Sequence, residues 1–333
     1  MKLIPFAFAL LLAAQVSACE LCTIYNIENA YATRTDSSSG FLFALSEQYV
    51  NYDTLQFKGE PFPGHSPFFQ SAFLHSSITH FVPGYNFSSR LGVSLNIPYV
   101  YREFHRTEVT PFGKRIDERG TISDPGDTAL IGRWTAFQLH EMDYAVNLNI
   151  LLGVKFPTGE TERLEDERRQ EILYQSAFGK KHAHAFGGIH QHDLSAGTGS
   201  FDGVFGATGN VRWKRLFFNG QVQYYYRSEA LDYQMGDEVI VSGGPGVYVL
   251  LVDKATFSVQ ANAFYENQNS DRALDQVNVQ TGFTSWYFGP QLAFTWGERF
   301  SANAGVDIPL RIFNRGIQDV PSYRVHGGVS WKF

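Results

Sequence analysis

Hydrophobic and polar residues alternate with a period of two along most of this chain. Between positions 90 and 101, the apolar residues Leu91, Val93, Leu95 and Ile97 are separated by smaller or more polar ones. The segments 144–156, 218–227, 257–266 and 300–311 show the same alternation. Alternation sustained over such segments is typical of strands rather than helices. A strand of about ten residues is also long enough to cross a bilayer at a tilt.

About twelve such segments predict an all-β fold, a transmembrane antiparallel up-and-down β-barrel with one long, partly helical outer loop. The sheet must close into a barrel because an open edge would leave backbone polar groups unpaired in hydrocarbon. Tight turns alternate with longer polar loops, and short turns of this kind face the periplasm. The predicted strands are 39–52, 68–82, 87–103, 125–139, 142–156, 200–213, 217–228, 238–252, 255–267, 282–296, 299–311 and 321–333. The alternation is weakest in 68–82 and in 238–252.

The two ends of the chain carry export and assembly signals. Lys2, the apolar run 3–14 and the small residues that follow it have the features of a signal peptide over residues 1–18. Ordinary cleavage before Cys19 and acylation of Cys19 both fit this sequence. The final strand alternates down to Phe333 and resembles the signal that the outer-membrane barrel assembly machinery recognises. We therefore expect a signal peptide (1–18), a periplasmic segment (19–38) and a barrel (39–333) with both termini in the periplasm.

The composition agrees with a barrel in a Gram-negative-type outer membrane. The 333 residues include 29 Phe, 17 Tyr and 31 Gly, and the formal net charge is -6. Aromatic residues suit a lipid-facing wall and its interfacial girdles. No basic stripe indicates binding to nucleic acid. After the signal peptide, no run of ~18 apolar residues would form a transmembrane helix. Outer-membrane lipid is the expected surrounding.

If the apolar residues face lipid, the residues between them face the barrel interior. The cationic side chains expected to line the pore are Arg133, Lys155, Arg212, Arg227, Arg311 and Arg324. The anionic ones are Asp202, Glu266 and Asp307, with Asn147, Asn149 and Gln223 beside them. These mixed charges could form a transverse field for a polar or zwitterionic solute. Alternatively, they could form internal ion pairs that fill and brace a narrow barrel.

The segment 157–199 is too long to be a bare connection and predicts a functional loop. Part of its first half, from Thr161 onward, is densely charged and lacks Pro and Gly up to Gly179. This predicts a helix in which Leu164, Ile172 and Phe178 share one stripe. Such a helix could fold over the mouth and narrow it, or it could lie on the surface.

The second half of this loop contains four of the ten histidines, His182, His184, His190 and His192. Each His-x-His pair in extended backbone presents two imidazoles to one side, and Asp193 could add a carboxylate. Such ligands suit zinc, copper or nickel, although histidine is also an ordinary polar residue in wet loops. The neighbouring Ser195 and Ser200 lack a hydrolase-like context, so we expect no enzyme. Cys19 and Cys22 could form a disulfide, bind metal or include one acylated cysteine.

Two short motifs resemble the outer-membrane transporter family of putative phenol-degradation meta-pathway proteins. The first runs from Lys155 through Pro157-Thr158 to Gly159, and the second runs from Leu194 through Gly197 and Gly199 to Asp202. Ala196 stands where the family usually has Leu. The resemblance implies an outer-membrane barrel that transports small, often hydrophobic compounds. The motif also has a structural interpretation, because its glycines permit a bend or bulge and Asp202 can pair with an arginine in the lumen.

Three functional hypotheses follow. The first is a passive channel for small solutes, with the 157–199 loop controlling its mouth. The second is a metal-binding or metal-regulated barrel that uses the histidine-rich loop. The third is a plugged structural barrel that anchors a periplasmic partner. The sequence does not identify the transported solute or the oligomeric state.

Overall fold

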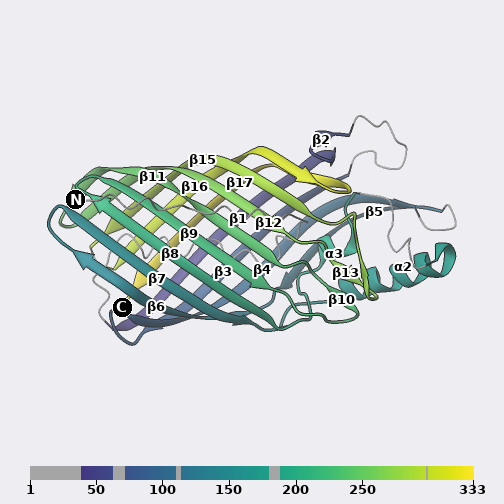
Figure 1. Ribbon diagram of the computed structural model, residues 1–333, viewed down its shortest axis with the longest axis horizontal. Helices are drawn as coiled ribbons and strands as arrows, with labels where there is room; N and C mark the ends of the chain where they lie inside the picture. The colour runs from purple at the N-terminus through teal and green to yellow at the C-terminus, as the bar shows by residue number, and fades with distance from the viewer. Residues whose placement is uncertain (1–38, 63–71, 110–113, 180–187, 298) are drawn as a thin grey trace, which may run out of the picture.

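A closed antiparallel barrel of twelve strands forms the body of the molecule (Figure 1). The computed structural model describes residues 39–62, 72–109, 114–179, 188–297 and 299–333. Of the fourteen strands in the main sheet, β2 (Glu60–Pro61) and β5 (Arg115–Pro125) lie off the wall. The other twelve are β1 (Gly40–Phe57), β3 (Phe73–Asn86), β4 (Leu91–Val109), β6 (Ala129–His140), β7 (Tyr144–Lys155), β8 (Asp202–Trp213), β9 (Leu216–Tyr226), β11 (Glu238–Val252), β12 (Ala255–Gln268), β15 (Phe283–Trp296), β16 (Phe300–Asn314) and β17 (Ile317–Lys332). The predicted fold is confirmed.

The seam between the first and last wall strands closes the barrel. β1 pairs with β17 from Leu42, opposite Lys332, to Phe57, opposite Ile317. The start of β1 and the C-terminus of the chain therefore lie at one end of the barrel, which we call the terminus end. The opposite end, where the longer connections lie, is the loop end (Figure 1).

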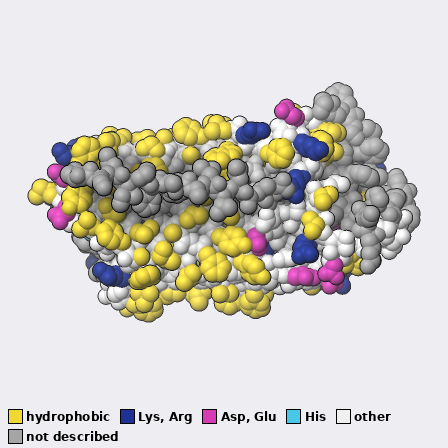
Figure 2. Space-filling view, viewed as in Figure 1, with side chains coloured by type: hydrophobic (Ala, Val, Ile, Leu, Met, Phe, Trp, Pro, Cys, Tyr) yellow, Lys and Arg dark blue, Asp and Glu magenta, His cyan; other side chains and the backbone are white. Residues whose placement is uncertain are grey.

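The outer wall is apolar, as the alternation predicts. Large side chains such as Trp134, Leu152, Phe218 and Trp286 are exposed on it. Figure 2 shows hydrophobic side chains spread over the wall, with charged side chains gathered toward the two ends. The inward positions of the same strands are mainly polar and buried. This arrangement matches a barrel whose outer face contacts hydrocarbon. Among the described residues, no helix is long and apolar enough to cross a membrane.

Two predicted connections are wrong in detail. The segment 83–86, predicted as a turn, belongs to β3, and the chain turns at 87–90 instead. The segment 104–124, predicted as a loop, is largely a hairpin in which β5 pairs with the extended end of β4. β6 pairs with the first part of β4 and β5 pairs with the rest of it. β5 therefore continues in line with β6, beyond the end of the barrel wall. The alternation did not predict these strands because the hairpin is polar and charged, and it lies beyond the apolar band of the barrel wall.

The loop end carries two helices and a small sheet. α2 (Glu162–Phe178) falls within the segment predicted to be helical, and α3 (Gln191–Leu194) is a single turn that follows it. β10 (Tyr233–Gln234), β13 (Arg272–Ala273) and β14 (Gln276–Val277) form the second, three-stranded sheet. Figure 1 shows these elements gathered at the loop end of the barrel. The predicted signal peptide (1–18) and the predicted periplasmic segment (19–38), which includes Cys19 and Cys22, lie outside the described residues.

Candidate functional site

The barrel interior has two zones with different chemistry. In the half nearer the loop end, charged groups and two apolar clusters fill the lumen. In the half nearer the terminus end, most buried side chains are amides and hydroxyls. We call this zone the amide belt; it contains Ser46, Gln48, Thr135, Asn147, Asn149, Thr208, Asn210, Asn219, Gln221, Gln223, Ser258, Gln260 and Gln291. Asn147, Asn149 and Gln223 were predicted to face the interior, and all three are buried there.

The first part of the charged zone is a chain of ion pairs that begins next to β6. The Lys155 ammonium lies 2.5 Å from Asp127 and 2.9 Å from Asp202. Arg227 continues the chain, 3.3 Å from Asp202 and 2.7 Å from Glu238. All five side chains are buried. Each cation therefore lies between two carboxylates, which compensates its charge where water is excluded.

Arg324 forms the second part of this zone on the opposite flank. Its guanidinium lies 3.2 Å from Glu266 and 3.3 Å from Asp307. The same guanidinium stacks between two aromatic rings, 4.0 Å from the Phe264 centroid and 3.8 Å from the Tyr287 centroid. Cation–π contacts of this kind add to the two ion pairs. We call these eight charged residues the charge girdle; they are Asp127, Lys155, Asp202, Arg227, Glu238, Glu266, Asp307 and Arg324.

The two family-like motifs meet at the start of the girdle. A Cβ added at Gly159 would lie 2.8 Å from Gly126 and 2.8 Å from Gly197, so three backbones pack directly against one another. The Asp127 carboxylate accepts hydrogen bonds from the backbone amides of Gly159 (3.0 Å) and Thr198 (2.8 Å). Gly197 thus permits close backbone contact, and Gly199, with a φ of 71°, permits the predicted bend. The predicted pairing of Asp202 with an arginine is confirmed by Arg227.

Residues 188–200 fold into the loop-end half of the lumen, and we call them the plug. Leu194 is fully buried and packs with Tyr52, Leu74 and Phe104 on the inner wall. Arg102 of β4 donates hydrogen bonds to the plug carbonyls of Asp193 (2.7 Å) and Ser195 (2.8 Å). Since Arg102 is itself buried, its guanidinium ties the plug firmly to the wall. A charged donor of this kind forms a stronger hydrogen bond than a neutral one.

α2 covers the plug with a largely polar face. Its buried positions are Leu164, Glu167, Glu171 and Tyr174, whereas Ile172 is 43% exposed. The predicted apolar stripe is therefore wrong at Ile172, and the side chain of Phe178 lies outside the described set. Carboxylates occupy the buried side of the helix because they face a histidine of the plug.

That histidine is His192, which lies at the centre of an acidic cluster. Its ring nitrogens lie 3.4 Å from Glu167, 3.3 Å from Asp193 and 3.9 Å from Asp271. Burial alone would lower the pKa of His192, but the carboxylates outweigh it and raise that pKa to about 10. Burial and the neighbouring Glu167 raise the pKa of Glu171 to about 9. The imidazole is therefore positively charged at neutral pH, and Glu171 is protonated.

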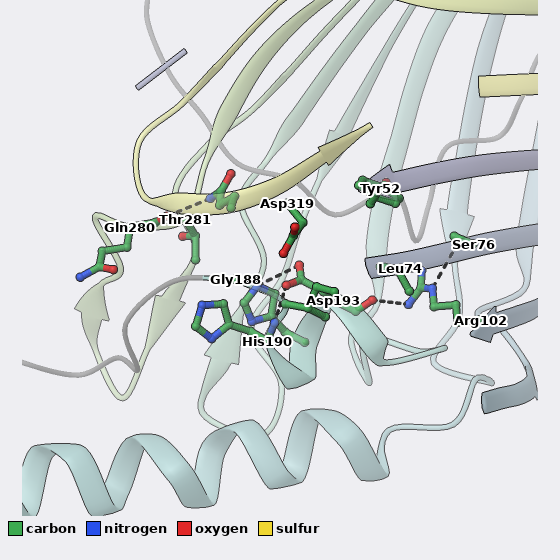
Figure 3. Close-up of a pocket in the computed structure, with 13 residues that line it drawn as sticks. Tyr52, Leu74, Ser76, Arg102, Gly188, His190, Asp193, Gln280, Thr281 and Asp319 are labelled. Atoms are coloured by element: carbon green, nitrogen blue, oxygen red, sulfur yellow. Dashed lines mark hydrogen bonds and ion pairs between the residues drawn. The ribbon is translucent and has the colours of Figure 1, made fainter. Parts of the chain in front are cut away.

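A pocket lies between the plug and the wall (Figure 3). It is partly open to solvent. His190 and Asp193 of the plug line one side, and Gln280, Thr281 and Asp319 line the other. The Asp193 carboxylate accepts a hydrogen bond from the His190 backbone amide at 2.8 Å.

The predicted interior cations fall into three groups. Lys155, Arg227 and Arg324 are buried in the girdle. Arg133 is half-buried and donates to Asn86 at 2.8 Å and Thr135 at 3.0 Å, and Arg212 bonds to backbone carbonyls at the terminus-end turns. Arg311 is exposed, and its predicted inward position is wrong. The pairing of β15 with β16 shifts between Trp286 and Tyr287, so Leu310 forms a bulge and the side chains beyond it change faces.

The structure describes two of the four histidines in the predicted metal site, His190 and His192. His182 and His184 lie outside the described residues. The rings of His190 and His192 stack with centroids 5.4 Å apart and an interplanar angle of 9°. In the part of the chain that the structure describes, no group of three or more His, Cys, Asp or Glu is arranged to hold a metal ion. A site that includes His182 and His184 stays a prediction.

Three residues important to this site were not singled out from the sequence, namely Arg102, Asp127 and Glu238. Asp127 follows a Pro125-Gly126 pair that signals a turn, yet nothing local indicates that its carboxylate holds a segment seventy residues later. Arg102 and Glu238 occupy positions near strand ends that the alternation assigns to the interior. Their partners come from distant strands, which the alternation does not specify.

No protein-family model and no curated protein matches the sequence. Among solved structures, an outer membrane channel from Pseudomonas putida F1 superposes with a TM-score of 0.57 at 10% identity, covering 89% of this chain and 96% of that one. The beta domain of the Bordetella autotransporter BrkA gives a TM-score of 0.44 at 9% identity over 89% and 100% of the two chains. The transport unit of the autotransporter AIDA-I from Escherichia coli gives 0.42 at 9% identity over 92% and 97%. The first similarity shows that this chain has the fold of an outer-membrane β-barrel.

Proposed function

We propose that this chain is an outer-membrane channel for the passive transport of small solutes, with its termini in the periplasm and its plug at the outer mouth. The observation that carries this proposal is the contrast between an apolar outer wall and a polar inner wall in one closed barrel. Lipid supports the outer wall, whereas buried amides without partners require water or a polar solute. The likeness in fold to the Pseudomonas putida channel is consistent with the proposal.

The plug makes the proposed channel a gated one. Residues 188–200 are joined to the wall through Arg102, Asp127 and the apolar contacts of Leu194. The plug arises from the connection between β7 and β8, so it is a loop folded inward rather than a separate domain. Its release would join the amide belt to the outer mouth. The rate of solute passage should therefore depend on how firmly these contacts hold.

Conductance in a planar bilayer tests this proposal. Wild-type protein should give small or infrequent steps, and Arg102→Met should give larger or more frequent ones because it removes two hydrogen bonds to the plug. Arg119→Met is the matched control, since Arg119 is exposed on β5, pairs with Glu103 across 3.7 Å and lies over the Phe73 ring, away from the plug. Absence of steps from all three proteins would contradict the channel and favour the plugged structural barrel. Steps that close when zinc or copper is added would favour metal regulation through the histidine-rich loop.

A further inference from the structure

We infer that the lumen favours small, uncharged solutes rich in hydroxyl groups over ions and over apolar compounds. This inference rests on the proposed channel function and names its solute class. It comes from the amide belt, whose members are amides and hydroxyls, and from the charges of Arg133 beside the belt and of the charge girdle.

The polar atoms of the belt have unused hydrogen-bonding capacity. Both amide atoms of Gln48, the Oδ1 atom of Asn147, the Oε1 atom of Gln291 and the hydroxyl of Ser46 have no hydrogen-bond partner among the described residues. All four side chains are more than nine-tenths buried. An amide offers donors and an acceptor, and a solute hydroxyl is both a donor and an acceptor. A polyhydroxylated solute can therefore replace the water that these groups require.

An ion meets a different situation in the belt. It would lose part of its hydration, and the belt amides and hydroxyls supply no opposite charge to offset this cost. A cation would in addition be repelled by Arg133, which is half-buried and donates a hydrogen bond to the belt residue Thr135 across 3.0 Å. An anion would be repelled by the charge girdle, which contains five carboxylates and three cations. Each kind of ion therefore meets a charge of its own sign in one of the two zones.

An apolar solute is also poorly matched to the belt. It would displace water from Gln48, Asn147 and Gln291 without forming hydrogen bonds to them, and buried polar groups left unpaired raise the free energy. The hydrophobic solutes implied by the family resemblance are therefore not the class that this lining favours. The belt amides and hydroxyls therefore disfavour apolar solutes, while Arg133 and the charge girdle disfavour ions.

Swelling of proteoliposomes can separate these classes. Sorbitol, gluconate and glucosamine are six-carbon solutes that differ mainly in charge, and each is tested with wild-type protein and with Arg102→Met. We expect sorbitol to enter about tenfold faster than either ion, a rate difference set by the barrier height. Gluconate or glucosamine entering as fast as sorbitol would overturn the solute class while leaving the channel intact. No entry of any solute through either protein would overturn the channel function itself.

Charge-introducing variants test the belt directly. Asn147→Asp and Gln48→Glu change an amide to a carboxylate of similar shape, and each should shift the reversal potential in a KCl gradient toward cation selectivity. The matched control is Asn267→Asp on β12. Glu266, the residue before it, faces the lumen, so the half-buried Asn267 lies on the opposite face of the strand, where its amide donates to Thr284 across 2.8 Å. An unchanged reversal potential in both belt variants, with barrel folding verified by heat modifiability on gels, would overturn the inference.

Discussion

Lys155 and Asp202 lie opposite each other on β7 and β8, with the Lys155 ammonium 2.9 Å from the Asp202 carboxylate. Lys155 begins one of the two family-like motifs, and Asp202 ends the other. The ion pair therefore closes the base of the long loop that carries α2 and the plug. Asp127 binds the same ammonium from the next connection along the wall. The motifs thus describe one structural junction rather than two separate sites.

Removal of the central cation should weaken this junction. Lys155→Met leaves Asp127 and Asp202 facing each other in a buried site, and breaking a buried pair from one side costs about 3–5 kcal/mol. We expect a lower midpoint of urea unfolding, measured by tryptophan fluorescence in detergent. Lys254→Met, in the exposed turn between β11 and β12, serves as the control. Equal midpoints for the two variants would show that Lys155 does not hold the loop.

A methyl group at the triple-glycine contact should displace the plug without changing any charge. The Cβ of Gly197→Ala would lie 2.7 Å from the Gly159 carbonyl carbon, a distance that requires the two backbones to separate. We expect faster hydrogen–deuterium exchange in the peptide covering residues 188–200. Gly209→Ala on β8 is the control, because its Cβ would meet only the Asn147 carbonyl oxygen, at 3.8 Å. Identical exchange in the two variants would contradict the close contact.

Alkaline pH should loosen the plug. The folded-state pKa of His192 is raised to about 10, against an ordinary value of 6.5. The stabilisation by its ion pairs is therefore fully present below about pH 6.5 and is lost as the pH rises toward 10. Glu171, with its pKa raised to about 9, contributes with the same sign because its charged form is disfavoured in the cluster.

The measurement is channel opening between pH 6 and pH 10. Open probability in the wild type should rise with pH as Glu167, Asp193 and Asp271 lose their imidazolium partner. His192→Gln should be open more often at pH 6 and should show a smaller pH dependence. If the wild-type open probability is constant or falls with rising pH, the acidic cluster around His192 does not hold the plug in place.

Metal retention should not depend on His192. A coordinating imidazole must be neutral, whereas the His192 ring is held as a cation by its carboxylate neighbours. We expect zinc, copper or nickel retained after dialysis, measured by mass spectrometry, to be the same in wild type and in His192→Gln. Replacement of His182 and His184 is the comparison that tests the rest of the predicted set. Loss of retained metal in His192→Gln would show that the ring serves as a ligand.

The barrel could be predicted from sequence because the alternation of lipid-facing and inward residues is a local pattern. Each wall strand alternates between lipid and lumen, so the inward positions of Lys155, Asp202 and Arg324 follow from counting along one strand. Arg311 shows where counting fails, since the bulge at Leu310 inserts one residue and reverses the faces beyond it. Nothing in the local pattern of that segment distinguishes a bulged strand from a regular one.

The candidate site was harder to predict because its contacts are long-range and its buried surfaces are polar. α2 buries Glu167 and Glu171, so a search for an apolar stripe assigned Ile172 to the packed side. The inward folding of the plug depends on Arg102 and Asp127, which lie far from it in the chain. Only the combined geometry of several strands brings these groups together.

The seating of the plug also constrains the order of assembly. Its binding surface includes Tyr52 of the first wall strand and the backbone carbonyl of Ile317 on the last, which accepts a hydrogen bond from Gly188 at 2.8 Å. Those two strands become neighbours only when the seam between β1 and β17 closes. The plug can therefore make its full set of wall contacts only in the closed barrel, so its complete seating follows the pairing of the last strand with the first.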